Sequence, residues 1–523
     1  MRRRWLQFAA AGAATSLAPA SWPADPTPGV VAPDLCASEG AFVQSLYIPG
    51  GEGAQARLAL GSERLTMRAV AQSDALAFTA TASGRRFTNP TLVVDEGSTI
   101  AVDVVNDLPE PTATHWHGLT VDTRNDGNGE APIMPGERFG YGFTVRNRGG
   151  LYWYHPHPHG ATASQVHRGL FGLLEVDDDD QRALRRALDL TPGATELSLV
   201  LQDRRAGDAD RYAPAPEDEL LGWYGCLPHV NGVLRPFHQV APRRYRLRIL
   251  NAANARTFRL AFRRDNGTPV PFALIGTDGG LLEAPVQCNE VLLSPAERID
   301  LVIDFAPVGQ GGFVIMESRA FAPMHDVRTA SVRADAGDAS HAHRPAHAIA
   351  DGAPLDLLQF RVRGSRSPNP PLPKRLSRLP AMPASTGDDR PLRLGFAKGR
   401  WRINDRVYDM QAAPIEVARG GSETWLLRNY HTSAPHAMHL HGFQFRVVER
   451  ETSPDQLAPL AIGSNGRVAT DLGLKDTVLV WPGESVRIAI DFRTPFVGPQ
   501  IYLLHCHNLE HEDAGMMLRV KVD

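Results

Sequence analysis

The chain has 523 residues, of which 43% are hydrophobic and 22% are charged, and its net charge is −3. This composition indicates a globular protein of about three domains. It gives no electrostatic basis for binding nucleic acid or an anionic membrane. Beyond the N-terminal segment, no stretch reaches the ~20 apolar residues of a membrane span. We therefore expect a monomer with no nucleic-acid partner and no membrane span.

The N-terminus has the pattern of an export signal. Arg2, Arg3 and Arg4 precede a short apolar stretch, Phe8–Leu17, and small residues follow at Ala18-Pro19-Ala20. We predict a cleaved segment over residues 1–20. Its basic start resembles a twin-arginine signal, and an ordinary secretory signal is the alternative. The mature protein is expected to be soluble and periplasmic, or otherwise exported.

An internal repeat divides the rest of the chain. Three strand-like stretches end at an asparagine, and each is followed later by a Pro-x-Glu turn and an alternating strand. The stretches are Thr99–Asn106, Arg244–Asn251 and Glu423–Asn429. The turns begin at Pro135, Pro295 and Pro482. Alternation of this kind predicts β-strands, and the repetition predicts three related units. We expect an all-β chain with domains at 40–185, 186–355 and 375–523 and a linker at 356–374. Asp180–Leu190 is one short helix candidate.

Two further features have open interpretations. Of the four cysteines, Cys226 and Cys288 both fall in the middle domain and could pair in an exported protein; buried free thiols are the alternative. The stretch 336–383 is rich in Pro, Ala, Arg and Ser, and contains His341, His343 and His347. These histidines could gather metal ions loosely, although a solvated connector explains them as well.

Histidines gather in four clusters, two in the first domain and two in the third. They are His115-Trp116-His117, His155-Pro156-His157, His436-Ala437-Met438-His439-Leu440-His441, and His505-Cys506-His507 followed by His511 and Met516. Residues i and i+2 of a strand point to one face, so each His-x-His pair aims two imidazoles at one place. The middle domain has Ala252-Ala253-Asn254 at the matching position. Domains 1 and 3 are therefore predicted to hold metal.

The cysteine cluster is the most specific of the four. A cysteine with two histidines and a weak axial methionine is the ligand set of a blue copper site, and His436, Cys506, His511 and Met516 supply it. If the Cys506 side chain points one way along an extended segment, those of His505 and His507 point the other way. This arrangement predicts a short covalent path between two metal centres.

In order and spacing the four clusters resemble the multicopper oxidases, and the ending His505–Met517 looks most like the bacterial periplasmic copper-efflux oxidases. The resemblance implies three cupredoxin-like Greek-key β-barrel domains and four copper ions. Carried over residue by residue, it assigns His436, Cys506, His511 and Met516 to type 1 copper, His115 and His439 to type 2 copper, and His117, His155, His157, His441, His505 and His507 to the type 3 pair. Other histidines, including His159, His167, His229 and His431, are expected on the surface or in loops.

The resemblance also implies a reaction. One-electron oxidation of a donor at type 1 copper would be coupled to four-electron reduction of O2 to water at the trinuclear cluster. Asp126 and Glu512 lie beside the ligands in sequence, and the resemblance implies that they relay protons; Asp126-Gly127 is also an ordinary turn former. An axial Met516 implies a type 1 potential lower than an apolar residue would give.

The electron donor stays open between phenols, as in laccases, and Cu(I). Copper-efflux oxidases typically carry a methionine-rich cover over type 1 copper, but the stretch in the corresponding place, 336–383, has histidines instead. Asp409-Met410 could form a small metal-docking pair or belong to a surface strand. Two alternatives lack turnover: a periplasmic copper-binding or tolerance protein, and a copper-free structural protein of the same fold. A copper nitrite reductase is disfavoured because it lacks histidines on both sides of its cysteine.

Overall fold

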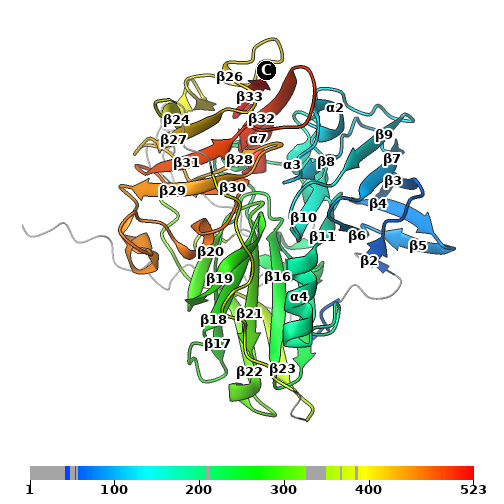
Figure 1. Cartoon of the computed structure of the whole chain (residues 1–523), viewed down its shortest axis with the longest axis vertical. Helices are drawn as coiled ribbons and strands as arrows, with labels where there is room; N and C mark the ends of the chain where they lie inside the picture. The colour runs from blue at the N-terminus through cyan, green and yellow to red at the C-terminus, as the bar shows by residue number, and fades with distance from the viewer. Residues whose placement is uncertain are drawn as a thin grey trace, which may run out of the picture.

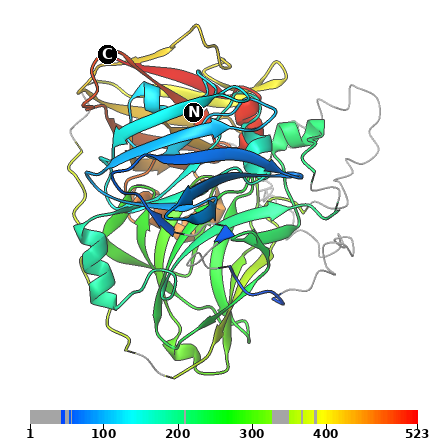
Figure 2. The same ribbon diagram turned by 90° about the vertical axis from the view of Figure 1, so that its right-hand side faces the viewer.

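The structure is a computed structural model, and it describes residues 42–47, 53–54, 57–207, 211–325, 349–365, 368–382 and 387–523. Within these described ranges, strands dominate and form six sheets, which lie in three pairs (Figure 1). The middle pair occupies one end of the molecule, and the first and third pairs lie side by side at the other (Figures 1 and 2). The predicted export signal, the connector histidines and Cys36 fall outside the described residues.

The first pair of sheets follows the alternating hydrophobic pattern of its strands, and its core is built around residues such as Met67, Val104 and Trp116. One sheet has the order β1-β5-β4-β3-β7-β9 and the other β2-β6-β11-β10-β8. The strands are β1 (Gly53–Ala54), β2 (Arg57–Ala59), β3 (Leu65–Gln72), β4 (Ala75–Ala82), β5 (Arg85–Thr88), β6 (Thr91–Asp95), β7 (Thr99–Asn106), β8 (His115–His117), β9 (Arg138–Thr144), β10 (Gly150–His155) and β11 (Gly172–Asp177). Short helices α2 (Thr123–Asp126) and α3 (Thr162–His167) lie between strands, and α4 (Asp179–Leu188) follows them; α4 confirms the predicted helix.

The middle pair has the orders β14-β13-β12-β16-β21-β18-β19 and β15-β23-β22-β17-β20. Its strands are β12 (Glu196–Arg204), β13 (Leu227–Val230), β14 (Val233–Leu234), β15 (Phe237–Val240), β16 (Arg244–Asn251), β17 (Phe258–Arg264), β18 (Phe272–Thr277), β19 (Gly280–Cys288), β20 (Glu290–Leu293), β21 (Arg298–Asp304), β22 (Phe313–Ser318) and β23 (Leu355–Val362). Helix α5 (Pro216–Leu221) and the 3-10 turn η2 (Ala306–Val308) belong to its connections.

The third pair has the orders β25-β24-β27-β31-β29 and β26-β33-β32-β28-β30. Its strands are β24 (Arg390–Ala397), β25 (Arg400–Ile403), β26 (Ile415–Val417), β27 (Ser422–Asn429), β28 (His436–Leu440), β29 (Phe445–Glu451), β30 (Thr477–Val480), β31 (Ser485–Asp491), β32 (Gln500–Cys506) and β33 (Met517–Val522). Two 3-10 turns, η4 (Asp455–Leu460) and η5 (Ala469–Asp471), and helix α7 (Leu509–Asp513) complete it.

The asparagine that ends each repeated strand has the same structural role three times. The side-chain amides of Asn106, Asn251 and Asn429 donate to the carbonyl two residues before the Pro-x-Glu turn, at Ile133 (2.7 Å), Leu293 (2.9 Å) and Val480 (3.0 Å). Their backbone amides bond to the carbonyls of Glu137, Glu297 and Glu484. Each asparagine thus ties the end of its strand to the turn that opens the next one. The predicted repeat corresponds to a real structural unit.

The domain boundaries stay a prediction, but the middle domain includes residues that were expected elsewhere. Strand β23 pairs with β22 and β15 and runs to Val362, so the middle sheets continue into the predicted linker. Ser45 bridges to Phe237, and Leu46 packs in the middle core, although residues from 40 were expected in the first domain.

Cys226 and Cys288, whose pairing was one of two open interpretations, are not bonded to each other. Cys226 is disulfide-bonded, whereas Cys288 and Cys506 carry free thiols. Cys288 lies at the end of β19, where its thiol is 3.6 Å from the carbonyl of Val286. Membership of one domain was too coarse a criterion, because a disulfide needs closely spaced β-carbons.

Candidate metal centre

Strand pairing brings the histidine clusters together. In the first domain β8 runs antiparallel to β10, which sets His115 opposite His155. In the third domain β28 runs antiparallel to β32, which sets His439 opposite His505 and Met438 opposite Cys506. Because successive residues of a strand face opposite sides, His505 and Cys506 belong to different faces of β32. The same alternation explains why two separate clusters form here.

The first cluster contains eight histidines, four from the first domain and four from the third. All are buried; they are His115, His117, His155, His157, His439, His441, His505 and His507. Imidazoles of the two domains stack in pairs, with ring centroids 3.8 Å apart for His115 with His441 and for His117 with His439. The cluster therefore lies between the two domains and requires both.

The outer nitrogens of this cluster are held by the backbone. Nδ1 of His115 lies 2.8 Å from the carbonyl oxygen of Asp126, and Nδ1 of His439 lies 2.8 Å from that of Asp476. Their Nε2 atoms are buried and have no hydrogen-bond partner among the described residues. Burial lowers the pKa of His439 well below its usual value, so its imidazole is neutral. Buried, neutral imidazoles with unpartnered nitrogens fit a metal ion.

Both predicted proton carriers touch this cluster. Asp126 is fully buried, and its Oδ2 lies 2.9 Å from Nδ1 of His441. The turn interpretation also holds, because Gly127 ends α2 at φ 67° and a β-carbon there would meet the carbonyl of Thr114 at 1.9 Å. The Oε2 atom of Glu512 lies 3.1 Å from Nδ1 of His505. Burial would raise the pKa of Glu512, but the adjacent His157 and His505 hold it well below its usual value.

The second cluster contains His436, Cys506 and His511. The thiol sulfur of Cys506 lies 3.6 Å from Nδ1 of His436 and 3.6 Å from Nδ1 of His511. Burial raises the pKa of this thiol to about 12 and lowers that of His511 to about 3. Met516 is buried in the same core cluster as Cys506. Two imidazoles, a sulfur and a nearby thioether are a donor set that copper favours.

The outer edges of this second cluster are covered. Nε2 of His436 lies 3.1 Å from the hydroxyl of Ser433, and Nε2 of His511 lies 2.9 Å from the carbonyl oxygen of Leu220 in α5. The ring of Trp401 packs 4.9 Å from both imidazoles, and its Nε1 donates to the same Leu220 carbonyl at 2.8 Å. Leu220 and Trp401 therefore cover the outer edge of His511.

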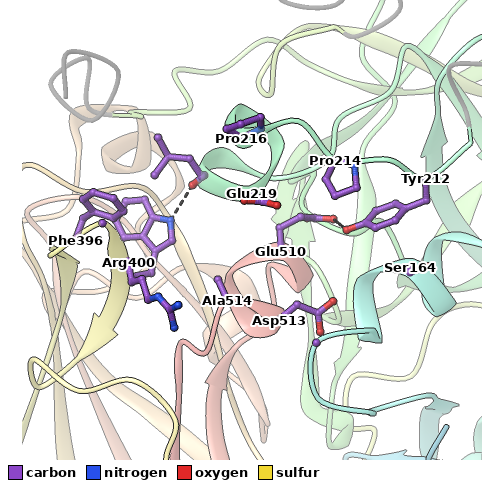
Figure 3. A pocket seen from close by; sticks show the side chains of 14 residues that line it. Ser164, Tyr212, Pro214, Pro216, Glu219, Phe396, Arg400, Glu510, Asp513 and Ala514 are labelled. Carbon is purple, nitrogen blue, oxygen red and sulfur yellow. Dashed lines mark hydrogen bonds between the residues drawn. The ribbon is translucent and has the colours of Figure 1, made fainter. Parts of the chain in front are cut away.

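A cavity of about 590 Å³ adjoins this cover (Figure 3). Leu220 and Trp401 line it on the side of the second cluster. Its other lining residues are partly apolar and partly acidic; they are Gly160, Ser164, Tyr212, Pro214, Pro216, Glu219, Phe396, Gly399, Arg400, Glu510, Asp513 and Ala514. In Figure 3 the carboxylate of Glu510 points at the phenol of Tyr212, which lies 3.1 Å from it.

Several functional residues were not predicted. Asp476, Leu220 and Trp401 contact the clusters from positions with no sequence motif. The stretch 336–383 was expected in the place where copper-efflux oxidases carry a methionine-rich cover. Residues 336–348, 366–367 and 383 fall outside the description, and of the rest Asn369 and Leu376 bond to β16 and β19 of the middle domain.

The structure also bears on two smaller expectations, the exposure of His167 and the setting of Asp409 and Met410. His167, expected on the surface or in a loop, is buried at the end of α3 and packs against Tyr212 and Trp223. Asp409 and Met410 lie between β25 and β26 and not in a strand, so the surface-strand interpretation is wrong. Asp409 lines a separate hollow of about 410 Å³ with Leu518 and Arg519, and Met410 is 44% exposed.

Comparison with known proteins agrees with this geometry. Family models described as multicopper oxidase match residues 66–181 and 379–523. The chain is 32% identical over 443 residues to a laccase of Haloferax volcanii, covering 79% of this chain and 67% of the relative. It is 27% identical over 437 residues to the multicopper oxidase mco of Staphylococcus aureus, covering 83% and 81%. The crystal structure of the McoA multicopper oxidase from Aquifex aeolicus superposes with a TM-score of 0.79 at 31% identity, over 92% and 99% of the two chains.

The chain belongs to the multicopper oxidase family. Its sheets match the cupredoxin-like domains of that family, as predicted. It is a copper-dependent oxidoreductase, which couples oxidation of a reduced substrate to reduction of O2. Within the described ranges, no helix is long and apolar enough to cross a membrane.

Proposed function

We propose that this chain binds four copper ions and oxidises a small phenolic donor one electron at a time. In this proposal His436, Cys506, His511 and Met516 hold type 1 copper, and His115 and His439 hold type 2 copper. The type 3 pair is held by His117, His155, His157, His441, His505 and His507. The observation that supports this most is the arrangement on β32, where Cys506 faces one cluster and its neighbours His505 and His507 belong to the other.

When bound, copper supplies the one-electron steps and the reduction of O2; the protein supplies position and protons. Asp126 holds its carboxylate against His441, and Glu512 holds its carboxylate against His505. We propose that both relay protons to the reacting oxygen, because both are buried beside the cluster. Their burial also keeps bulk water from the site.

The cavity beside Leu220 and Trp401 supports a phenolic donor. Pro214, Pro216, Leu220 and Phe396 give it apolar walls, and its volume of about 590 Å³ is typical of a small-molecule site. Cu(I) is the second candidate, because the carboxylates of Glu219, Glu510 and Asp513 also line the cavity. No thioether, the soft ligand that Cu(I) prefers, is among the lining residues. We therefore favour the phenol.

The test is to load the purified protein with copper and to measure its visible spectrum and its O2 uptake with a phenol and with Cu(I). We expect an intense blue thiolate band and faster turnover of the phenol. Cys506→Ser should abolish both the band and turnover. Cys288→Ser is the matched control, because this free thiol lies in the middle domain, away from both clusters. If the protein binds copper but takes up no O2, the alternative of a copper-binding or tolerance protein is favoured. If it binds no copper, a structural role is favoured.

We further propose that the protein is exported and monomeric. The basic and apolar N-terminal segment supports export. Cell fractionation with and without residues 1–20 tests export, and size-exclusion chromatography with light scattering tests the oligomeric state. Cytoplasmic retention of the full chain, or a mass near twice 57.0 kDa, would contradict these two proposals.

A further inference from the structure

The described part of the middle domain contributes no histidine to either cluster, yet its repeated turn reaches the eight-histidine cluster. The residue that follows Pro-x-Glu is Arg138 in the first domain and Ser485 in the third, and neither is buried. In the middle domain it is Arg298, which is 1% exposed. A buried arginine requires charged or polar partners, so its surroundings show what it holds.

The guanidinium of Arg298 joins all three domains. Nη1 and Nη2 bond to the two carboxylate oxygens of Asp476 in the third domain, at 2.7 and 2.5 Å. Nε donates to the carbonyl of Leu151 in β10 of the first domain, at 3.1 Å. Within the middle domain the guanidinium also donates to the carbonyls of Ala296 and Asp278. A bidentate arginine–carboxylate pair fixes orientation as well as charge.

Asp476 in turn holds two histidines of the eight-histidine cluster. Its Oδ1 lies 3.1 Å from Nε2 of His117, and its carbonyl oxygen lies 2.8 Å from Nδ1 of His439. These two imidazoles stack with only 12° between their planes. One aspartate therefore sets the rotation of one ring from the first domain and one from the third. Such outer contacts set which ring nitrogen faces a metal.

The residues around Arg298 and Asp476 pack closely against them and balance their charges. Gly118 follows the His115-Trp116-His117 cluster, and a β-carbon there would lie 2.6 Å from Oδ2 of Asp476 and 2.8 Å from Nη2 of Arg298. Lys475, next to Asp476, bonds to Asp278 at 3.0 Å and to Glu297 at 2.7 Å. The cations and carboxylates at this junction therefore partner one another, which buried charges require.

We propose that Arg298 is a positioning residue for the trinuclear copper site, and that it acts through Asp476 on His117 and His439. The middle domain, which supplies no copper ligand in the proposed assignment, thereby orients ligands of type 2 and type 3 copper. This inference rests on the proposed copper assignment. Its specific consequence is that loss of Arg298 affects the eight-histidine cluster and spares the His436–Cys506–His511 cluster.

The test compares Arg298→Met, Arg298→Lys and Asp476→Asn with the matched control Arg246→Met in the full-length protein. Arg246 is also fully buried in the middle domain and bonds to carboxylates, Asp300 and Glu196, but touches no histidine of either cluster. Copper per chain is measured by elemental analysis, with the blue band reporting type 1 copper and electron paramagnetic resonance reporting types 1 and 2.

We expect Arg298→Met to keep the blue band and to fall from about four copper ions per chain to about one. Arg298→Lys should retain an intermediate amount, because an ammonium keeps the charge but not the bidentate geometry. If Arg298→Met does not fold, Asp476→Asn keeps the volume and should alter the type 2 resonance. Arg246→Met should keep all its copper whatever its stability. A full copper complement and an unchanged type 2 signal in both Arg298→Met and Asp476→Asn would overturn the inference. Copper loss in the control Arg246→Met equal to that in Arg298→Met would also overturn it. A wild-type protein without blue copper would instead refute the proposed function.

Discussion

Trp401 and His511 donate to one acceptor, the carbonyl oxygen of Leu220, at 2.8 and 2.9 Å. This carbonyl belongs to α5 of the middle domain, whereas both donors belong to the third. The middle domain thus reaches both histidine clusters, directly through Leu220 at the cysteine-containing cluster and, at the other, through Arg298, which holds Asp476.

Trp401→Phe should alter donor oxidation and leave O2 reduction unchanged. The phenyl ring cannot donate to Leu220, so α5 is held by one hydrogen bond fewer, a loss of about 1 kcal/mol in the free energy of unfolding. The side chain also lines the donor cavity, so the KM for a phenol should change. Steady-state kinetics with a phenol measures KM, and reoxidation of the fully reduced protein by O2 isolates the second half of the reaction.

Trp425→Phe is the matched control for this change. Trp425 is fully buried in the same domain and its Nε1 also donates one hydrogen bond, at 2.8 Å to Glu423, but it does not line the cavity. It should reduce stability in a similar way without changing KM. Equal KM shifts in both variants, or slower reoxidation by O2 in Trp401→Phe, would contradict a role in the donor site.

Asp126→Asn should slow O2 reduction. The amide can still accept a hydrogen bond from Nδ1 of His441, so the ring keeps its place while the ability to carry a proton is lost. Loss of a general acid–base group lowers a rate by at least about a hundredfold. Stopped-flow reoxidation measures the effect, and the blue band should be unchanged. Asp122→Asn, which alters only the cap of α2, should react like the wild type.

The copper-free protein should lose stability as the pH falls below neutrality. Burial lowers the pKa of His157 and of His507 to about 3, against about 6.5 in an unfolded chain. Between these values the unfolded chain binds protons that the folded chain does not, so lower pH favours unfolding. Each such histidine should destabilise the fold by roughly 2 kcal/mol at pH 5.

Thermal denaturation of the copper-free protein between pH 8 and pH 5 measures this dependence. His157→Gln should flatten the slope, because it removes one proton-binding difference between the two states. His431→Gln is the control, since His431 is exposed. A melting temperature independent of pH over this range would contradict the burial argument.

Met516→Leu should raise the type 1 potential. Leucine has a similar volume, so the change in unfolding free energy should stay below about 1.5 kcal/mol, but it removes the thioether near Cys506. A redox titration of the blue band measures the potential. Met517→Leu is a control at the adjacent buried position, and an equal shift in both variants would rule out a specific role of Met516.

The sequence by itself determined much of the fold and the membership of both clusters. The asparagine-ending strands over Thr99–Asn106 and Arg244–Asn251 have the predicted bounds, because alternation of apolar residues and the asparagine at the strand end are local features. The eight histidines of the first cluster form four pairs at spacing i, i+2, which is a local property of the chain, whereas His436, Cys506 and His511 were assigned through a ligand set known from blue copper sites and the resemblance to multicopper oxidases.

Only the tertiary structure decided which partners surround those ligands. Arg298 lies 178 residues from Asp476, Leu220 lies 291 residues from His511, and Asp126 lies 315 residues from His441. Contacts over such separations depend on how three domains pack, and no local spacing encodes them. The cavity and the cover of His511 are likewise products of packing. The local sequence therefore specified which histidines and which cysteine gather, while the assembly of the domains specified their orientation, the residues that contact them and the cavity beside Leu220 and Trp401.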